Sequence, residues 1–450
     1  FWLDCDNRKL WIGKNGTIPN SGNVATGANP QASWATTPTD RYFNATCQNV
    51  ASGVGVLNAG QNPSFNGELT GGNVGTNTDK NGYGLFKYDP SGTDFIACCA
   101  GNQLVEDAID PAQTDTDYPQ KLFSPTTYSG NDTTNNITGV GFQPDLMLFK
   151  IRNTASSGMW VDTNRGRTKA FYSITNDAEV TIANITAIGT DGFSLDGTSD
   201  LKANFNGNGN TYVVWAWRAN GGTTATNASG SLSVTQQVDP SGSFSISNYS
   251  GDGGTDTIGH GLSRAPTMVI IKQINGANNF AVYAKGAGAT KYAYLDTDAA
   301  FGTATMWQNT TPSSSLVYLG DNNEVNHSGR TYVAYCFADT EGFFKSGSYV
   351  GNGDSNGPFV YTGFKPSVVY VKLVASAGDW WVEDTARDTY NPATKYLAWN
   401  KSDAEASGIN IDFLSNGFKI RTTSGDFNSN GATIVYGAWA KNPFKYATAR

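Results

Sequence analysis

The stretch GVGFQPDLMLFK, residues 139–150, decides the fold because the chain repeats its pattern twice more. The second copy, GHGLSRAPTMVIIK, covers residues 259–272, and the third, YTGFKPSVVYVK, covers residues 361–372. Each copy has a glycine-containing turn, a proline and an apolar run, and its final lysine follows the proline by six positions. Proline is tolerated at the first position of a strand, and the apolar run has the length of a buried strand. Because these runs are almost continuously apolar, they predict three central strands with both faces covered. The predicted strands span residues 145–150, 267–272 and 367–372.

The whole unit around each stretch repeats as well. A closing aromatic strand follows the proline after 66 to 68 residues in every copy, as TYVVWAWR, TYVAYCFA and ATIVYGAWA. Several landmarks that agree in order and spacing indicate an internal repeat. We therefore expect three related antiparallel β-sandwich repeats, at residues 126–220, 232–340 and 341–445. A proline-containing connector, 106–125, precedes them, and a flexible linker, 221–231, separates the first two. Repeats two and three have no linker and should pack as a rigid pair.

The composition favours short strands joined by turns, and therefore an all-β protein. Glycine accounts for 52 of 450 residues, aromatic residues for 12% and charged residues for only 15%. The net charge of -8 argues against a nucleic-acid partner, and no apolar stretch approaches the ~20 residues of a membrane-spanning helix. The five cysteines lack the spacing of a disulfide or zinc framework. We interpret Cys336, in a closing strand, as a small core residue.

The N-terminal segment FWLDCDNRKLWIGKNGT predicts a β-hairpin that ends in an Asn-Gly turn. This segment, with SGNVATGANP (21–30) and NGYGLFKYDPSGTDFIACC (81–99), resembles the SPRY domain, a concanavalin-like β-sandwich. The resemblance implies an incomplete SPRY-like sandwich over residues 1–105. The strands that should precede Phe1 are missing, so we expect an unfilled edge or completion by residues outside this sequence.

A SPRY-like domain followed by tandem repeats resembles a group of virion proteins from tailed bacteriophages. The third repeat carries the sharpest similarity, in GSYVGNGDSNGPFVYTGFKP, WWVEDTARDTYNP, IDFLSNGFKIRT and WAKNPFKYATAR. The resemblance implies a structural or appendage role on the virion exterior, at the tail or capsid surface. It implies other virion proteins as partners, a homo-oligomer, and no cofactor.

The sequence shows little sign of catalysis. His260 and His327 have no metal-ligating partner at i+2 or i+4, and no nucleophile elbow is present, so both histidines are interpreted as surface turn residues. No alternating acidic strand provides the two facing carboxylates that glycoside hydrolysis needs. The Asp- and Asn-rich turn at 320–326 lacks EF-hand spacing. We therefore expect no enzyme, no catalytic residue and no metal ligand.

An Asp–Arg pair recurs at one position of two repeats, beside tryptophan. Each pair stands 18 and 21 residues after the repeat's proline, and repeat two has Ala284 and Ala287 there. Either the pair binds a sugar beside an aromatic platform, or it is a structural clamp. The tandem tryptophans of repeat three must send one ring outward, unless repeat two buries it. The candidate binding residues are Trp160, Asp162, Arg165, Trp380, Trp381, Asp384, Arg387 and Tyr390.

Three functions remain open at this point. The first is a tail-fibre or appendage protein that contacts the host surface and binds glycans. The second is a capsid or tail decoration protein without a receptor role. The third, which the sequence favours least, is a polysaccharide-cleaving enzyme. Repetition without a repeated acid–base pair favours binding or building over catalysis.

Overall fold

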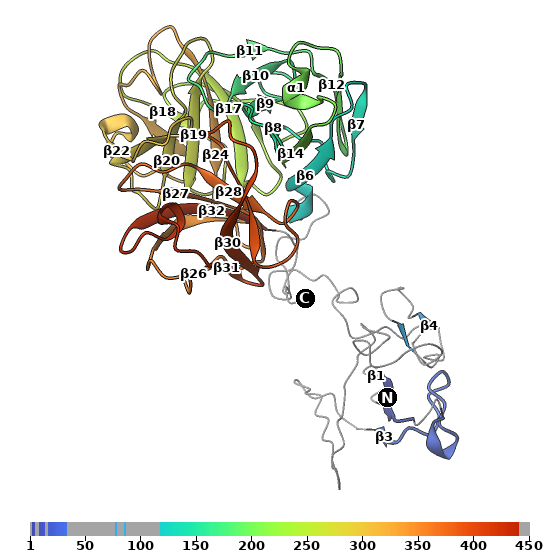
Figure 1. The fold of residues 1–450 in the computed structure, drawn as a ribbon. Helices are drawn as coiled ribbons and strands as arrows, with labels where there is room; N and C mark the ends of the chain where they lie inside the picture. The colour runs from blue at the N-terminus through green and yellow to red at the C-terminus, as the bar shows by residue number, and fades with distance from the viewer. Residues whose placement is uncertain are drawn as a thin grey trace. The chain divides into compact units, whose positions relative to one another are not determined.

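The computed structural model describes residues 2–4, 9–13, 17–33, 77–78, 85–86 and 118–440. The chain divides into two compact units, Phe1–Val105 and Glu106–Arg450. The regular secondary structure of the described part is almost entirely antiparallel strand, which confirms the expected all-β fold class. Figure 1 shows the strands of both units.

The first unit contains the predicted N-terminal hairpin. Strand β1 (Trp2–Asp4) pairs with β2 (Lys9–Trp11), which also pairs with β3 (Ala32–Ser33). The indole of Trp11 is fully buried and donates to the carbonyl of Ala28, which ties the hairpin to the following loop. The remaining described elements are η1 (Pro19–Ser21), β4 (Asn77–Thr78) and β5 (Leu85–Phe86). The other parts of the SPRY resemblance, and Cys5, Cys47, Cys98 and Cys99, lie outside the described residues.

The second unit contains the three repeats, which we call modules 1 (123–217), 2 (225–337) and 3 (344–440). In each module the repeated stretch forms a fully buried central strand between the closing strand and the next strand along the chain. These three strands are β8 (Leu146–Ile151), β19 (Met268–Gln273) and β27 (Pro366–Leu373). The prediction of three doubly covered central strands is therefore confirmed, with each bound differing by one residue.

Module 1 is a six-stranded sheet packed on a three-stranded one. The large sheet has the order β11-β10-β9-β8-β14-β6 and the small sheet has the order β12-β13-β7. The elements besides β8 are η4 (Pro119–Lys121), β6 (Phe123–Ser129), β7 (Asn135–Ile137), β9 (Met159–Asp162), β10 (Lys169–Tyr172), β11 (Val180–Thr181), β12 (Ile185–Gly189), β13 (Gly192–Leu195), α1 (Lys202–Phe205) and β14 (Thr211–Trp217). Strand β6 begins at Phe123, inside the segment that the sequence assigned to the connector.

Module 2 adds two strands to the same plan, with the order β15-β16-β17-β24-β19-β20-β21-β22 and a small β18-β23 sheet. Its elements besides β19 are β15 (Ala225–Asn227), β16 (Val234–Val238), β17 (Phe244–Ser250), β18 (Asp256–Gly259), β20 (Ala281–Ala284), β21 (Lys291–Tyr294), β22 (Gly302–Thr303), η5 (Thr305–Trp307), β23 (Leu316–Leu319) and β24 (Thr331–Phe337).

Module 3 joins the two sheets into one, with the order β25-β32-β27-β28-β29-β30-β31-β26. The join is made by β30, which is longer than its counterparts and pairs with both β29 and β31. The elements besides β27 are β25 (Phe344–Val350), β26 (Phe359–Tyr361), β28 (Trp381–Asp384), β29 (Ala393–Ala398), β30 (Ala406–Leu414), β31 (Gly417–Ile420), α2 (Gly425–Asn428) and β32 (Thr433–Ala440).

The segment 221–231 is not the flexible linker that its composition suggested. Strand β15 lies within it and pairs with β16. The buried carboxylate of Asp145 accepts hydrogen bonds from the backbone N–H groups of Ala219, Gly221 and Gly222, which fixes the start of the segment. A carboxylate that gathers several amides imposes a turn on a Gly-rich segment. Composition alone could not show that Asp145, more than 70 residues earlier, organises it.

Each module has its own core between its two layers, and a fourth core joins all three. The own cores of modules 1, 2 and 3 use one face of each large sheet. The opposite faces meet in what we call the central core, which contains residues of all three modules. In Figure 1 the three modules lie around this shared centre, in green, yellow and red. Hence all three repeats pack as one body, rather than repeats two and three alone.

Candidate functional site

The central core has an aromatic residue from each module at its middle. Trp217, Phe337 and Trp439 occupy the same position of the three closing strands β14, β24 and β32. Each ring contacts the other two, with centroid distances of 5.5 to 6.0 Å. Three equivalent residues in mutual contact define a pseudo-threefold axis within one chain. The modules therefore form a closed ring, in which module 3 contacts module 1 as well as module 2.

The lysine that ends each repeated stretch lies at a joint of this ring. Lys150, Lys272 and Lys372 are almost fully buried, and each ammonium group donates to a carbonyl six residues later in its own module. Each also donates to backbone carbonyls of the preceding module around the ring. These acceptors are Lys401 for Lys150, Asn176 for Lys272 (2.8 Å), and Asp298 and Ala299 for Lys372 (2.9 and 2.8 Å). The same contact thus closes all three joints.

Burial also changes the pKa of these three lysines. Removal from water lowers the pKa of each to about 8, and nearby carboxylates oppose this only in part. At pH 7 the ammonium form still predominates, and its hydrogens meet carbonyl oxygens rather than water. A buried charge is tolerated only where such partners are supplied. The regular spacing of the lysines was visible in the sequence, but their role as joints was not.

The Asp162–Arg165 pair lies at the joint between modules 1 and 2. Arg165 Nε lies 2.6 Å from Asp162 Oδ2, and that oxygen also accepts a 2.7 Å hydrogen bond from the hydroxyl of Tyr335 in module 2. The guanidinium of Arg165 also binds Glu179 and lies 3.9 Å above the Phe171 ring. Burial opposes its charge, but the carboxylate of Asp162 raises the pKa of Arg165. The arrangement is a fully paired clamp across the joint.

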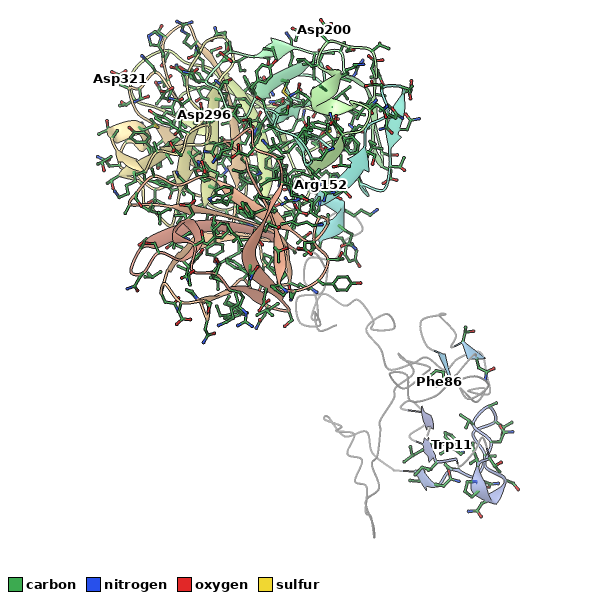
Figure 2. All side chains as sticks on the ribbon, in the orientation of Figure 1. Trp11, Phe86, Arg152, Asp200, Asp296 and Asp321 are labelled. Atoms are coloured by element: carbon green, nitrogen blue, oxygen red, sulfur yellow. The ribbon has the colours of Figure 1, made fainter. Side chains whose placement is uncertain are left out.

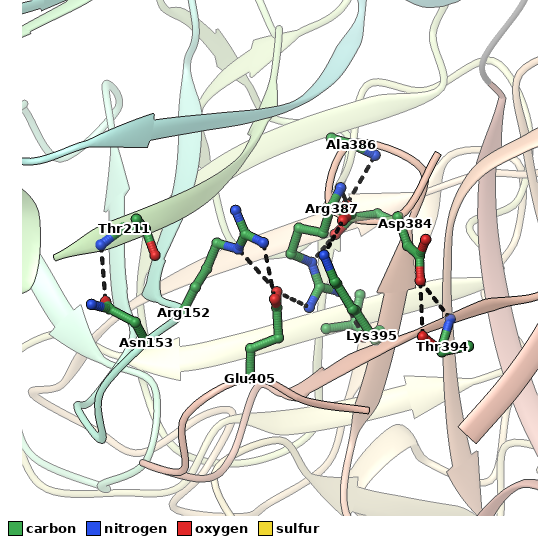
Figure 3. A network of polar contacts seen from close by, with 11 residues as sticks. Arg152, Asn153, Thr211, Asp384, Ala386, Arg387, Thr394, Lys395 and Glu405 are labelled. Atoms are coloured by element: carbon green, nitrogen blue, oxygen red, sulfur yellow. Dashed lines mark hydrogen bonds and ion pairs between the residues drawn. The ribbon is translucent and has the colours of Figure 1, made fainter. Parts of the chain in front are cut away.

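The Asp384–Arg387 pair repeats this arrangement at the joint between modules 3 and 1. Arg387 Nε lies 2.6 Å from Asp384 Oδ2, and the Trp215 indole of module 1 donates to the same oxygen at 3.1 Å. Arg387 also contacts Glu405, which forms a two-point ion pair with Arg152 of module 1. Figure 3 shows this line of charges, and Figure 2 places Arg152 at the edge of module 1 that faces module 3. Burial opposes ionisation of Glu405, but the two arginines lower its pKa below the usual value.

The joint between modules 2 and 3 has no such pair, and the closing strand explains the difference. Gly437 occupies the position of Trp215 and Tyr335, so module 3 offers no donor there. Instead the ring of Tyr370 fills the space: a Cβ on Gly437 would lie 2.2 Å from it. Ala284 of module 2 belongs to the same central core, where an unpaired Asp would be costly. The Asp–Arg pair is therefore present only where the neighbouring module supplies a hydrogen-bond donor.

The structure places most of the predicted binding residues inside the molecule. Trp160, Asp162, Trp380, Asp384 and Arg387 are at most 4% exposed, and the side chain of Arg165 is 2% exposed. The expectation that they form an accessible sugar-binding surface is thus wrong, and the alternative of a clamp and of burial under a neighbouring module holds.

The two adjacent tryptophans of module 3 pack on opposite faces of its sheet. Trp380 donates to the Tyr294 carbonyl of module 2 and lies in the central core. Trp381 is half-buried; it packs edge-on against Tyr396 and donates to Asp426. Of the eight candidates, only Tyr390 is strongly exposed, at 83%.

The two histidines differ from each other. His327 is exposed, as expected for a turn residue. His260 is fully buried, so its assignment to the surface was wrong; its ring accepts from the N–H of Leu262 and lies 3.3 Å from the Ser313 carbonyl. Burial lowers the pKa of His260. Within the described ranges, no group of three His, Cys, Asp or Glu side chains is placed to hold a metal ion. No helix among those residues is long and apolar enough to cross a membrane.

Residues 118–443 match a family described as a domain of unknown function, DUF7483. The match covers well over half of the chain and includes all three modules. No curated protein shows significant similarity to this sequence. No solved structure does so either.

Proposed function

Because the chain belongs to the DUF7483 family, whose description assigns no activity, we propose a function from its geometry: a structural virion protein of a tailed bacteriophage, in an appendage that contacts the host surface. The observation that carries the proposal is the ring of three equivalent joints. All three modules share a buried strand, a lysine at its end and a closing strand, and all of these build the ring. What repetition has preserved in this chain is a scaffold rather than a reaction centre.

The charged residues of the joints support a scaffold as well. The carboxylates of Asp162 and Asp384 are bound by arginine, and both pairs are closed off by side chains of a neighbouring module. A general acid or base needs contact with its substrate. Carboxylates enclosed in this way are suited to holding modules together. A rigid body of this kind fits a part that must transmit force or position between a particle and a surface.

For contact with host glycans, we propose the exposed side chain of Tyr390. Tyr390 is strongly exposed in the loop between β28 and β29, and an exposed aromatic ring can stack on a sugar face. Binding of the full-length protein to a glycan array tests this part, with Tyr390→Ser as the variant. Exposed Lys202→Ser in module 1 serves as the matched control. Signals that are equal for all three proteins would remove the glycan part of the proposal.

The location of the chain tests the main proposal. Antibodies against residues 118–440, applied to intact particles and imaged by electron microscopy, should label the tail or its fibres. Label spread over the capsid would favour a decoration protein without a receptor role. Particles that carry no label, from a host that expresses the gene, would refute a virion role altogether.

A further inference from the structure

Strand β26 of module 3 is an edge strand whose outward side is open within the described structure. It pairs only with β31, in the register Phe359↔Lys419, Val360↔Phe418 and Tyr361↔Gly417. Along this ladder, Ile420 N–H donates to the Pro358 carbonyl and Thr362 N–H donates to the Asn416 carbonyl. Hydrogen-bonded and non-hydrogen-bonded pairs alternate in antiparallel strands. The N–H and C=O groups of Phe359 and Tyr361 therefore point away from the sheet.

The same edge is handled differently in the other two modules. In module 2 the chain itself covers it, because Leu232 N–H donates to the Thr257 carbonyl at 3.0 Å and Leu232 forms a parallel bridge to Ile258. In module 1 the outward-facing residues of the equivalent strand β7 are the polar Asn136 and Thr138. Natural proteins usually protect edge strands by covering them or by polar and charged residues. Among the residues that the structure describes, module 3 uses neither device on β26.

The side chains at this open edge are aromatic. Phe359 and Tyr361 occupy the positions of Asn136 and Thr138, and they are 46% and 65% exposed. The ring of Phe359 lies over Gly417, where a Cβ would come within 3.0 Å of it. Two exposed aromatic rings lie beside four backbone groups that have no partner in the described part of the chain, and such a surface is suited to the addition of another strand.

We propose that β26 pairs with β26 of a second copy of this chain, antiparallel, about a two-fold axis through Val360. In that register Phe359 faces Tyr361 of the other copy, and Tyr361 faces its Phe359. Both pairs are of the hydrogen-bonded type, so all four outward backbone groups of each strand find partners. The aromatic rings become cross-strand neighbours, an arrangement that stabilises sheets. The three-residue strand is thus self-complementary, as a two-fold contact requires. This inference does not depend on the virion assignment.

The contact is small, so the dimer should be weak. Two short strands and four rings bury less than the ~1,600 Å² that is typical of stable complexes. We expect a dissociation constant on the order of 0.1 mM for the full-length protein. Analytical ultracentrifugation over a range of concentrations should show a weight-average mass that rises above that of one chain.

The test variant comes from the chain itself. Phe359→Asn with Tyr361→Thr installs the residues of module 1 and should raise the dissociation constant at least about tenfold. Lys202→Ser changes an exposed side chain of module 1 and should leave the constant unchanged. Amide hydrogen exchange provides a readout without any substitution: the N–H groups of Phe359 and Tyr361 should exchange more slowly as the concentration rises. A constant monomer mass, a dimer that the double variant does not weaken, or exchange at 359 and 361 independent of concentration would each overturn the proposal.

Discussion

Removal of both members of the Asp384–Arg387 pair should destabilise the ring by much less than the sum of the two single removals. The perturbation is the set Asp384→Ala, Arg387→Ala and the double variant. Module 2 carries alanine at both equivalent positions, so the alanine backbone is compatible with the fold. Asp384 is completely buried, and its Oδ2 meets both Arg387 Nε at 2.6 Å and Trp215 Nε1 at 3.1 Å.

The magnitude follows from burial. Arg387→Ala leaves the Asp384 carboxylate buried without its counter-charge, and Asp384→Ala leaves the Arg387 guanidinium with the 3.2 Å contact to Glu405 as its remaining ion pair. Each single substitution should therefore cost about 3–5 kcal/mol. The double variant leaves no such charge, but the Trp215 N–H loses its acceptor, which costs about 1–3 kcal/mol, and a cavity adds to this. Glu405 keeps its two-point pair with Arg152 in every variant. We therefore expect the double variant to lose about 3–5 kcal/mol, roughly the cost of one single substitution.

The assay is urea unfolding of the full-length protein, followed by circular dichroism, with the four proteins compared as a double-mutant cycle. The exposed Lys202–Asp132 pair provides a control cycle and should show a coupling of at most about 1 kcal/mol. Additive effects of Asp384→Ala and Arg387→Ala, to within about 0.5 kcal/mol, would refute the reasoning that the pair acts as one buried unit.

Three further outcomes are expected. Lys372→Met leaves buried carbonyls without their donor and should lower the free energy of unfolding by about 2–4 kcal/mol. Burial lowers the pKa of Lys372 from 10.5 to about 8, so the folded state binds fewer protons than the unfolded state between these two pH values. In urea titrations from pH 8 to 10.5, the free energy of unfolding of the wild type should therefore rise relative to that of the variant. Burial raises the pKa of Glu383, whose carboxyl oxygens have no hydrogen-bond partner among the described residues, so the wild type should lose stability relative to Glu383→Gln as the pH rises above 4.5. A difference in urea midpoint between the two proteins that is the same at pH 4 and pH 8 would contradict this. Trp380→Ala should cost about 3–5 kcal/mol by opening the central core, whereas Tyr390→Ala should change the thermal midpoint hardly at all, and a larger effect of the second variant would contradict the assigned burial.

Much of the fold was present in the sequence because strand signals are local. The proline, the apolar run and the lysine recur at fixed spacing, and a continuous apolar run is sufficient to indicate a strand covered on both faces. The closing strands were recognisable for the same reason. Strand bounds at Phe123 and at Ala225–Asn227 were not, because they depend on pairing with residues far along the chain.

The candidate site was found in part, and the sequence left two interpretations of it open, a sugar-binding surface and a structural clamp. The Asp–Arg pairs were identified from their spacing, but their burial was decided by Tyr335 and Trp215, which are 173 and 169 residues away from the aspartates. The ring of the Trp380–Trp381 pair that points away from the core of module 3 is that of Trp380, and module 2 covers it at Tyr294. This is the alternative in which repeat two buries the ring. Whether an aromatic residue is exposed depends on what neighbouring modules place over it, and no local pattern records that.

The sequence by itself determined that this protein is all-β, that its second part is built from three copies of one unit, and that each copy has a buried strand ending in lysine. These properties follow from periodicity and composition, because strand formation and burial on both faces are indicated by residues that are close together in the sequence. Only the tertiary structure decided that the three units close into a ring and that Lys150 reaches Lys401, 251 residues later. Ring closure requires the outer faces of the three large sheets to pack against one another simultaneously. The free energy of this packing comes from contacts between modules and is not a property of any single module.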